Sequence, residues 1–177
     1  TGAFAEYAVA SASELVARPA GLDFESTSAL GVSGQTALQA IKDHLGVESG
    51  QKVLVTGASG GVGSFAVQVA KALGAEVTAV CSARNAELVR SIGADHVIDY
   101  TSEDFTRGEE RYDRILDNVG AHSMSDTRKA LAPDGLLLSN GAPVGGWFGG
   151  LGNPLRGMLW SIVSKQQARP FISTYSQ

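Results

Sequence analysis

A glycine-rich turn between a strand pattern and a helix pattern constrains this chain more than any other feature. The stretch VLVTGASGGVGSFAVQVAKALG, residues 53–74, joins a short β-branched run to an amphipathic pattern that ends at Gly74. Small residues let the backbone approach a ligand, and the free amides of a helix N-terminus favour negative charge. Another strand pattern follows about 20 residues on, as in dinucleotide-binding units. The turn Thr56–Gly63 therefore predicts a pyrophosphate site.

Five strand patterns alternate with helical patterns between residues 53 and 141. Continuous β-branched runs between amphipathic helices are typical of a parallel sheet covered on both faces. We therefore expect an α/β fold, a doubly wound parallel sheet of the Rossmann kind. The expected strands are KVLVTG, EVTAVC, HVIDY, YDRILDNVG and LLLSNGA, with a sixth at RPFISTY. The expected helices include GVGSFAVQVAKALG, NAELVRSIGA, SMSDTRKALAPDG (ended by Pro133) and LRGMLWSIVSKQQ, with a weak helical turn in EDFTRGEE.

The first 50 residues follow a different pattern. Residues 1–10 alternate like a strand, and Leu15–Ala17 is a candidate for a second one. Asp23 is expected to cap a helix, and two glycines divide SALGVSGQTALQAIKDHL into two helical pieces. We interpret residues 1–22 as a remnant of, or linker from, a separate catalytic domain. Residues 23–177 are expected to form a dinucleotide-binding domain that is truncated at its C-terminus.

Charge and cysteine content exclude several classes of partner. The net charge of −4, without any run rich in lysine and arginine, argues against nucleic acid as a partner. The single cysteine, Cys81, excludes an internal disulfide, and the three histidines have no ligand spacing, so we expect no metal site. The sequence contains no stretch of 18 apolar residues, so we expect no membrane-spanning segment. We expect a cytoplasmic protein, with mitochondrial import left open.

The turn also fits the T-G-x-x-x-G-x-G pattern of short-chain dehydrogenases. That family needs a catalytic Tyr-x-x-x-Lys on a later helix. The fourth position after each tyrosine holds Ser11, Asp104 or Leu116, or lies beyond the end of the chain. The short-chain interpretation therefore fails.

Read as A-x-G-G-V-G, residues 58–63 resemble the medium-chain dehydrogenases/reductases, with Ala58 in place of their usual first glycine. The segments GAFAEYAVA, AVQVAKALGAEV, VRSIGADHVIDY, ILDNVG and LAPDGLLLSNG are similar to successive signatures of that family. The resemblance covers nearly the whole chain and is weakest across residues 143–170. More narrowly, the chain resembles the quinone-oxidoreductase-like branch, which is zinc-independent and uses NADPH.

The end of the second predicted strand indicates which nicotinamide cofactor is bound. In this fold an acidic residue there binds the ribose hydroxyl of NAD, whereas a basic residue accommodates the 2′-phosphate of NADP. CSARN contains no carboxylate, but Ser82 offers a hydroxyl and Arg84 a planar cation that binds phosphate with two hydrogen bonds. The resemblance implies that Tyr100 touches the same phosphate. NADP(H) is favoured, the alternatives being a solvated Arg84 and a surface Tyr100 without a role.

Further candidates lie where the nicotinamide end is expected. In an open α/β sheet this end lies over the carboxyl ends of the fourth and fifth strands. Asp117 there is either a ligand contact or a structural acceptor. The resemblance adds Thr36 beside the ring, the alternative being a helix residue bonded back to its own chain. The cofactor-binding candidates are Thr36, Ser59, Gly60, Gly61, Val62, Gly63, Ser82, Arg84, Tyr100, Asn118, Gly120 and Gly141.

The resemblance implies an NADPH-dependent reductase that transfers hydride to a quinone or an α,β-unsaturated carbonyl compound. No catalytic residue is identified, and the fragment by itself is expected to be inactive. Two alternatives stay open: a zinc-dependent alcohol dehydrogenase of the same superfamily, and a non-catalytic NADPH-binding sensor or structural protein. The apolar segment 145–160 predicts either a substrate pocket or an interface. The resemblance also implies a homodimer through the sheet edge formed by residues 170–175.

Overall fold

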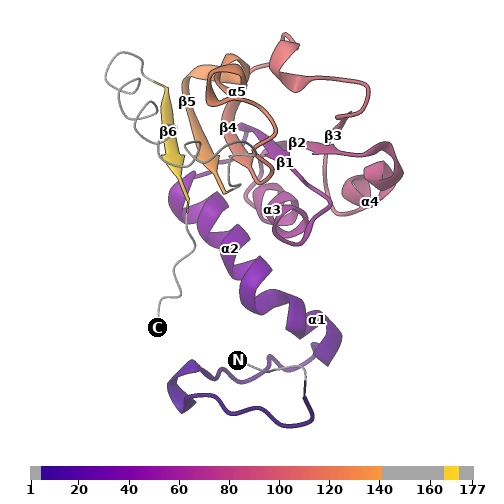
Figure 1. The fold of residues 1–177 in the computed structure, drawn as a ribbon, viewed down its shortest axis with the longest axis vertical. Coiled ribbons are helices and arrows are strands. Elements are labelled where there is room, and N and C mark those ends of the chain that lie inside the picture. The colour runs from indigo at the N-terminus through magenta and orange to yellow at the C-terminus, as the bar shows by residue number, and fades with distance from the viewer. Residues whose placement is uncertain (1–4, 141–165, 172–177) are drawn as a thin grey trace, which may run out of the picture.

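Six parallel strands form one sheet in the order β3-β2-β1-β4-β5-β6 (Figure 1). The computed structural model describes residues 5–140 and 166–171. This order is that of dinucleotide-binding folds made of two mononucleotide-binding halves, and it confirms the predicted doubly wound α/β sheet. The strands are β1 (Lys52–Thr56), β2 (Glu76–Cys81), β3 (His96–Asp99), β4 (Tyr112–Asp117), β5 (Leu131–Ser139) and β6 (Gln167–Pro170).

Helices connect the strands and cover the sheet. The longest regular one, α3, follows the glycine turn and is packed against β1 and β2. No helix in the described ranges is both long and apolar enough to cross a bilayer. The helices are α1 (Phe24–Ala29), α2 (Gln35–Leu38), α3 (Gly61–Ala72), α4 (Ala86–Ser91) and α5 (Met124–Thr127). Single 3₁₀ turns occur at Ala12–Glu14, Ala83–Asn85, Phe105–Arg107 and Arg128–Ala130.

Successive residues of the central strands face opposite layers. In β1, Val53 and Val55 join a large buried cluster with α2, α3 and α4, whereas Leu54 joins a smaller cluster that contains Phe105 and Ile115. All of the β1 valines and Leu54 are fully buried. Burial on both faces explains why β1 is a continuous apolar run rather than an alternating one.

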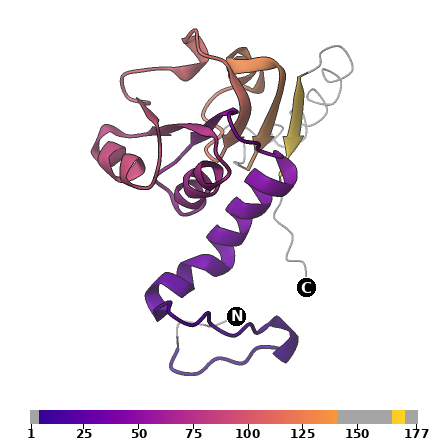
Figure 2. The ribbon, with the colours of Figure 1, turned by 180° about the vertical axis from the view of Figure 1, so that it is seen from behind.

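The chain from Phe24 to His44 is one helical rod, so the prediction of two helical pieces was wrong. Helical residues run without a break from Phe24 to His44, with wide π-helical turns over Leu30–Gly34 and Gln39–His44 (Figures 1 and 2). Gly34 itself has helical dihedral angles. A glycine costs a helix only about 1 kcal/mol, and packing of α2 on α3 offsets that cost.

The start of the rod is as predicted. Asp23 takes an extended conformation, and its carboxylate accepts a hydrogen bond from the amide of Ser26 at 2.6 Å. The bond satisfies one of the amides that the first turn of a helix leaves without a partner. The sequence therefore located the N-terminus of this helix correctly.

Residues 5–10 and Leu15–Ala17 are not strands, which corrects a second prediction. Val9 and Val16 are almost fully exposed. In the described part of the chain, no strand of the sheet pairs with either segment. An alternating pattern gives a strand only where a partner supplies hydrogen bonds and a face to pack on, and here the backbone follows an irregular path.

Strand β5 begins earlier than predicted and shortens the preceding helix. Regular helix ends at Thr127, and β5 starts at Leu131, which lies beside Tyr112 of β4. A shift in register then leaves Pro133 and Asp134 exposed at an irregular part of the strand. Proline has no amide to donate, so it is accommodated at this irregularity. The expected end of the helix at Pro133 was therefore wrong.

The sixth strand is present but begins two residues before the expected RPFISTY segment. It lies parallel to β5, with Gln167 beside Leu136 and Pro170 beside Ser139. Residues 172–175 of the expected strand lie outside the described residues, as do the apolar segment 145–160 and most of the helix expected at residues 155–167.

Candidate functional site

A cavity of about 530 Å³ opens at the carboxyl ends of β1, β2 and β4. The chain leaves β1 for β2 and β3 on one side and returns to β4 on the other, so the order reverses at β1. Ligands of open α/β sheets bind in the crevice at this point. Lining the cavity are Thr56, Gly57, Ser59, Val80, Cys81, Ser82, Arg84, Asn85, Tyr100, Phe105, Asp117, Val119, Ala121 and His122.

The glycine turn is packed too closely for larger residues. Gly57 has a φ of 60°, which favours glycine, and its carbonyl accepts a hydrogen bond from the Gly60 amide at 2.9 Å. A Cβ on Gly63 would lie 2.1 Å from the Gly57 carbonyl oxygen. Only glycine at position 63 lets α3 begin so close to the end of β1.

Among the described residues, no side chain caps the N-terminus of α3. Its cap residue, Gly60, has no side chain with which to satisfy the first amides, which belong to Gly61, Val62 and Gly63. Unpaired amides and the helix dipole together favour a phosphate. Ser59 lines the cavity beside this terminus. The turn therefore fits a pyrophosphate, and pyrophosphate binding stays a prediction.

The ribose-phosphate candidates meet at the ends of β2 and β3. Ser82, Arg84 and Tyr100 all line the cavity, although Tyr100 follows β3 and the other two follow β2. The Tyr100 amide donates to the Cys81 carbonyl at 3.2 Å, which holds the two strand ends together. Arg84 is exposed and forms no ion pair within the described ranges. A hydroxyl, a cation and a phenol thus surround this end of the cavity, and they fit a phosphate.

Asn85 lies between the glycine turn and the segment that carries Ser82 and Arg84, and sequence reasoning missed it. Its side-chain Nδ2 donates to Ser59 Oγ at 2.9 Å and lies 3.4 Å from Ser82 Oγ. Asn85 follows Arg84 directly, so it was hidden within the phosphate motif. Its partner Ser59 is 26 residues away, and only the tertiary structure brings the two together.

Asp117 is a structural hydrogen-bond acceptor. Its Oδ1 accepts from the Thr56 hydroxyl at 2.6 Å and from the amides of Val119 and Gly120 at 3.2 and 3.0 Å. The Asn118 side chain donates to the Thr56 carbonyl at 3.0 Å. These bonds join the ends of β1 and β4 and fix the backbone over which a nicotinamide end is expected.

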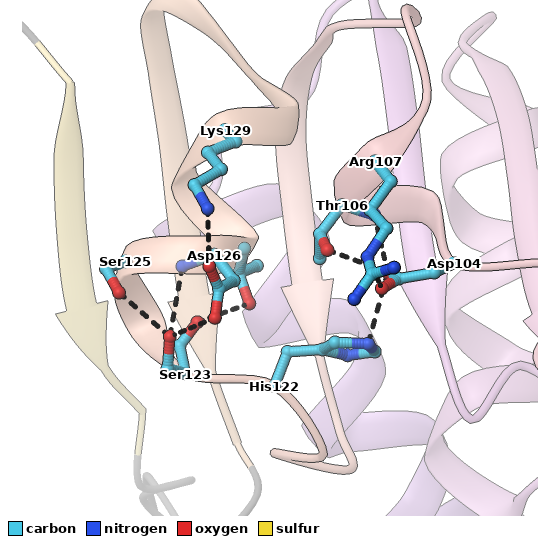
Figure 3. A network of polar contacts seen from close by, with 9 residues as sticks. Asp104, Thr106, Arg107, His122, Ser123, Ser125, Asp126 and Lys129 are labelled. Atoms are coloured by element: carbon cyan, nitrogen blue, oxygen red, sulfur yellow. Dashed lines mark hydrogen bonds and ion pairs between the residues drawn. The ribbon is translucent and has the colours of Figure 1, made fainter.

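The far wall of the cavity is aromatic, and it too was missed. Phe105 and His122 both line the cavity, with ring centroids 5.0 Å apart. His122 Nε2 lies 3.3 Å from a carboxylate oxygen of Asp104, which also accepts from the hydroxyl and amide of Thr106 (Figure 3). The Thr106 side chain, above all, holds the pKa of Asp104 below its usual range. The contact between Asp104 and His122 joins the 3₁₀ turn before β4 to the loop after β4.

The remaining candidate residues differ in whether they lie at the cavity. Gly61, Val62 and Gly63 lie in the first turn of α3. Asn118 and Gly120 alternate along the chain with Asp117, Val119 and Ala121, which line the cavity. Thr36 is buried in α2, which is packed on α3, and it does not line the cavity. Gly141 lies outside the described residues. Within residues 5–140 and 166–171, no three His, Cys, Asp or Glu side chains are grouped so as to hold a metal ion.

Comparisons with known proteins identify the family of the chain. Residues 61–149 match the model of the family described as zinc-binding dehydrogenase. The human protein named NAD(P)H oxidoreductase RTN4IP1, mitochondrial, is 42% identical over 148 residues, which are 80% of this chain and 36% of that protein. The Arabidopsis thaliana protein named chloroplast envelope quinone oxidoreductase homolog is 50% identical over 104 residues, 56% of this chain and 32% of that protein.

Solved structures of related oxidoreductases have the same fold. The quinone oxidoreductase from Coxiella burnetii superposes with a TM-score of 0.75 and 26% sequence identity, over 91% of this chain and 48% of that one. The chain thus spans about a third of the length of the curated relatives and about half of this solved structure. With the family model, these matches show that the chain belongs to the zinc-binding dehydrogenase family of the medium-chain dehydrogenase/reductase superfamily.

Proposed function

We propose that the intact protein is an NADPH-dependent reductase whose cofactor lies in the cavity at the carboxyl ends of β1, β2 and β4. The observation that carries the proposal is the group Ser82, Arg84 and Tyr100 at one end of this cavity. Among the described residues that line the cavity, Asp117 is the one with a carboxylate; it lies at the end of β4 and is engaged in hydrogen bonds. No acidic residue follows β2 directly, and Asp99, which pairs with Cys81 at the end of β3, does not line the cavity. No carboxylate of the described lining beside Arg84 therefore opposes a phosphate of about 1.5–2 negative charges.

The chain's own residues bind and orient the cofactor. Ser59 and the amides of the first α3 turn would hold the pyrophosphate, and the Arg84 guanidinium would bind the 2′-phosphate through charge-assisted hydrogen bonds. The ends of β4 and β5, with Asn118, Gly120 and Gly141, would support the nicotinamide ribose. Thr36 is buried in α2 outside the cavity lining and is no part of the proposed contact surface. When bound, NADPH supplies the hydride. The protein's part is to position the reacting carbon and to exclude water.

A quinone is the proposed hydride acceptor, with an α,β-unsaturated carbonyl compound as the second acceptor class. The names of the Arabidopsis relative and of the Coxiella structure support the first choice. The human and Arabidopsis names refer to a mitochondrion and a chloroplast envelope, whereas the single cysteine favours the cytosol.

The test is steady-state turnover of the intact protein with a soluble benzoquinone and with an enone, each with NADPH and with NADH. We expect a higher kcat/KM with NADPH. Arg84→Ala should lower that value by about 10- to 100-fold, because charge-assisted hydrogen bonds to the phosphate are lost, and should change the NADH value by less than about twofold. Arg111→Ala is the matched control, since Arg111 precedes β4 at the opposite edge of the sheet.

Three results would contradict the proposal in different ways. Equal kcat/KM values for the two cofactors would remove the NADPH preference. Binding of NADPH without turnover of any acceptor would favour a sensor or structural protein. Activity that requires stoichiometric zinc would favour an alcohol dehydrogenase of the zinc branch.

A further inference from the structure

We propose that Asn85 is a positioning residue that couples the pyrophosphate turn to the ribose-phosphate loop, and that this coupling sets the preference for NADPH. The inference rests on the proposed function and deepens it. It assigns specificity to a contact between two protein segments, in addition to the groups that touch the phosphate.

The contacts form a short bridge across the cavity. Asn85 Nδ2 donates to Ser59 Oγ at 2.9 Å, and Ser59 lies in the turn between β1 and α3. On the other side, the Asn85 amide donates to the Ser82 carbonyl at 2.9 Å and closes the 3₁₀ turn that carries Arg84. All four of these residues line the same cavity.

The position of Arg84 depends on this bridge. Arg84 is exposed and has no ion-pair partner among the described residues, so its place is set by the backbone turn that carries it. From the β3 side, the Tyr100 amide donates to the carbonyl of Cys81, directly before this turn, at 3.2 Å. Asn85 holds it from the side of the glycine turn. A guanidinium fixed before the ligand arrives loses less conformational entropy on binding phosphate.

Comparing the affinities for NADH and NADPH distinguishes a positioning role, which acts through Arg84, from direct contact with the pyrophosphate. NADH and NADPH share the pyrophosphate, so a change that affects only the turn weakens both equally. Only NADPH has the 2′-phosphate. If Ser59 acts on Arg84 through Asn85, a substitution at Ser59 changes the ratio of the two dissociation constants as well as their values.

The experiment is calorimetric titration of the intact protein with NADPH and with NADH, as a double-mutant cycle of Asn85→Ala, Ser59→Ala and the double variant. We expect each single variant to lower the NADPH-over-NADH affinity ratio by about three- to tenfold, the cost of one hydrogen bond. The double variant should lower it no further, because both substitutions break the same bridge. Gln68→Ala is the control, since that amide donates within its own helix to the Ser64 carbonyl.

Each outcome decides the inference. An unchanged ratio in Asn85→Ala, or equal weakening of both cofactors, would mean that Asn85 is only structural. Additive effects in the double variant would show that the two residues act separately and would overturn the coupling. If Asn85→Ala does not fold, Ser59→Ala tests the bridge without altering the Arg84 turn. Binding of neither cofactor by the wild type would instead overturn the proposed function and the inference with it.

Discussion

Contacts in the folded structure, and not the sequence pattern alone, decide which positions of the glycine turn require glycine. Gly61 and Gly63 both lie in the first turn of α3, yet their surroundings differ. A Cβ on Gly61 would approach the Ser33 hydroxyl at 2.8 Å, whereas one on Gly63 would collide with the backbone of Gly57 and Ala58. A hydroxyl can rotate away, but a backbone carbonyl at the end of β1 cannot. Gly63 is therefore the position of the turn that tolerates least change.

Gly63→Ala should destabilise the protein by about 1–3 kcal/mol and abolish binding of a dinucleotide, because the start of α3 must move away from β1. Gly31→Ala is the control: nothing lies within 4 Å of a Cβ there, and alanine favours helix. Urea denaturation of both variants and of the wild type measures the free energy of unfolding. Equal stability of the Gly63 and Gly31 variants would show that the collision is relieved cheaply.

The reactivity of the Cys81 thiol is also decided by the surroundings of a single residue. It is almost fully buried at the end of β2, although it borders the cavity. Burial, with a smaller contribution from the charge of Asp99, raises the pKa of the Cys81 thiol. The thiol therefore stays protonated near neutral pH, and Cys81 acts as a small apolar residue rather than a nucleophile.

At the scale of elements, one carboxylate joins α3, β2 and the start of β3. Asp95 accepts a hydrogen bond from the Lys71 ammonium at 2.5 Å and another from the Val77 amide at 2.8 Å. Lys71 lies in the last turn of α3, and Val77 lies near the beginning of β2. The Lys71 side chain, followed by the Val77 amide, lowers the pKa of Asp95. Asp95 thus stabilises the amino edge of the sheet, opposite the cavity.

Asp95→Asn should lower the free energy of unfolding by about 1 kcal/mol at pH 7, a value discounted for partial exposure. Because the folded pKa lies below the unfolded value of about 3.9, this stabilisation is complete above pH 4 or so and is lost as pH falls through the folded pKa. The difference between wild type and variant should therefore shrink on acidification. Denaturation at neutral and acidic pH measures it.

Asp43→Asn serves as the control for this pH dependence. Asp43 is an exposed carboxylate on the helical rod, and its substitution should change stability by less than about 0.5 kcal/mol. A difference between wild type and Asp95→Asn that stays constant from neutral to acidic pH would contradict the role given to the charge of Asp95.

At the scale of the whole molecule, the sheet and its two buried clusters form one unit. Leu116 lies near the carboxyl end of β4, beside Val55 of β1, and is fully buried in the larger cluster with α2 and α3. This cluster extends from the helical rod across the sheet to Phe171, beyond β6. Loss of packing in β4 should therefore affect the elements around it together.

Leu116→Ala should destabilise the protein by about 2–5 kcal/mol, through lost burial and the cavity left behind. Leu88→Ala on α4 is the control, because Leu88 is about half exposed and should cost less than about 1 kcal/mol. Thermal unfolding followed by circular dichroism compares the two. A similar loss for both variants would show that β4 relaxes around the missing side chain.

Local patterns predicted the elements where a segment's own chemistry decides its structure. Strand β2 begins and ends at the residues that EVTAVC indicated, because a β-branched run has few alternatives when glycine precedes it closely. The Asp23 cap and the glycine turn were likewise correct, since each depends on hydrogen bonds within a few residues. The rod from Phe24 to His44 and the early start of β5 were missed, because packing on α3 and pairing with β4 decide them.

The sequence by itself determined the α/β class, the glycine turn between β1 and α3 and the basic residue that follows β2, because these are properties of short segments. The tertiary structure alone decided which side chains meet at the cavity. Asn85 reaches Ser59 across 26 positions, and His122 meets Phe105 from the far side of β4. The strand order β3-β2-β1-β4 creates these contacts by bringing the carboxyl ends of separate strands to one edge, and no local periodicity encodes that order.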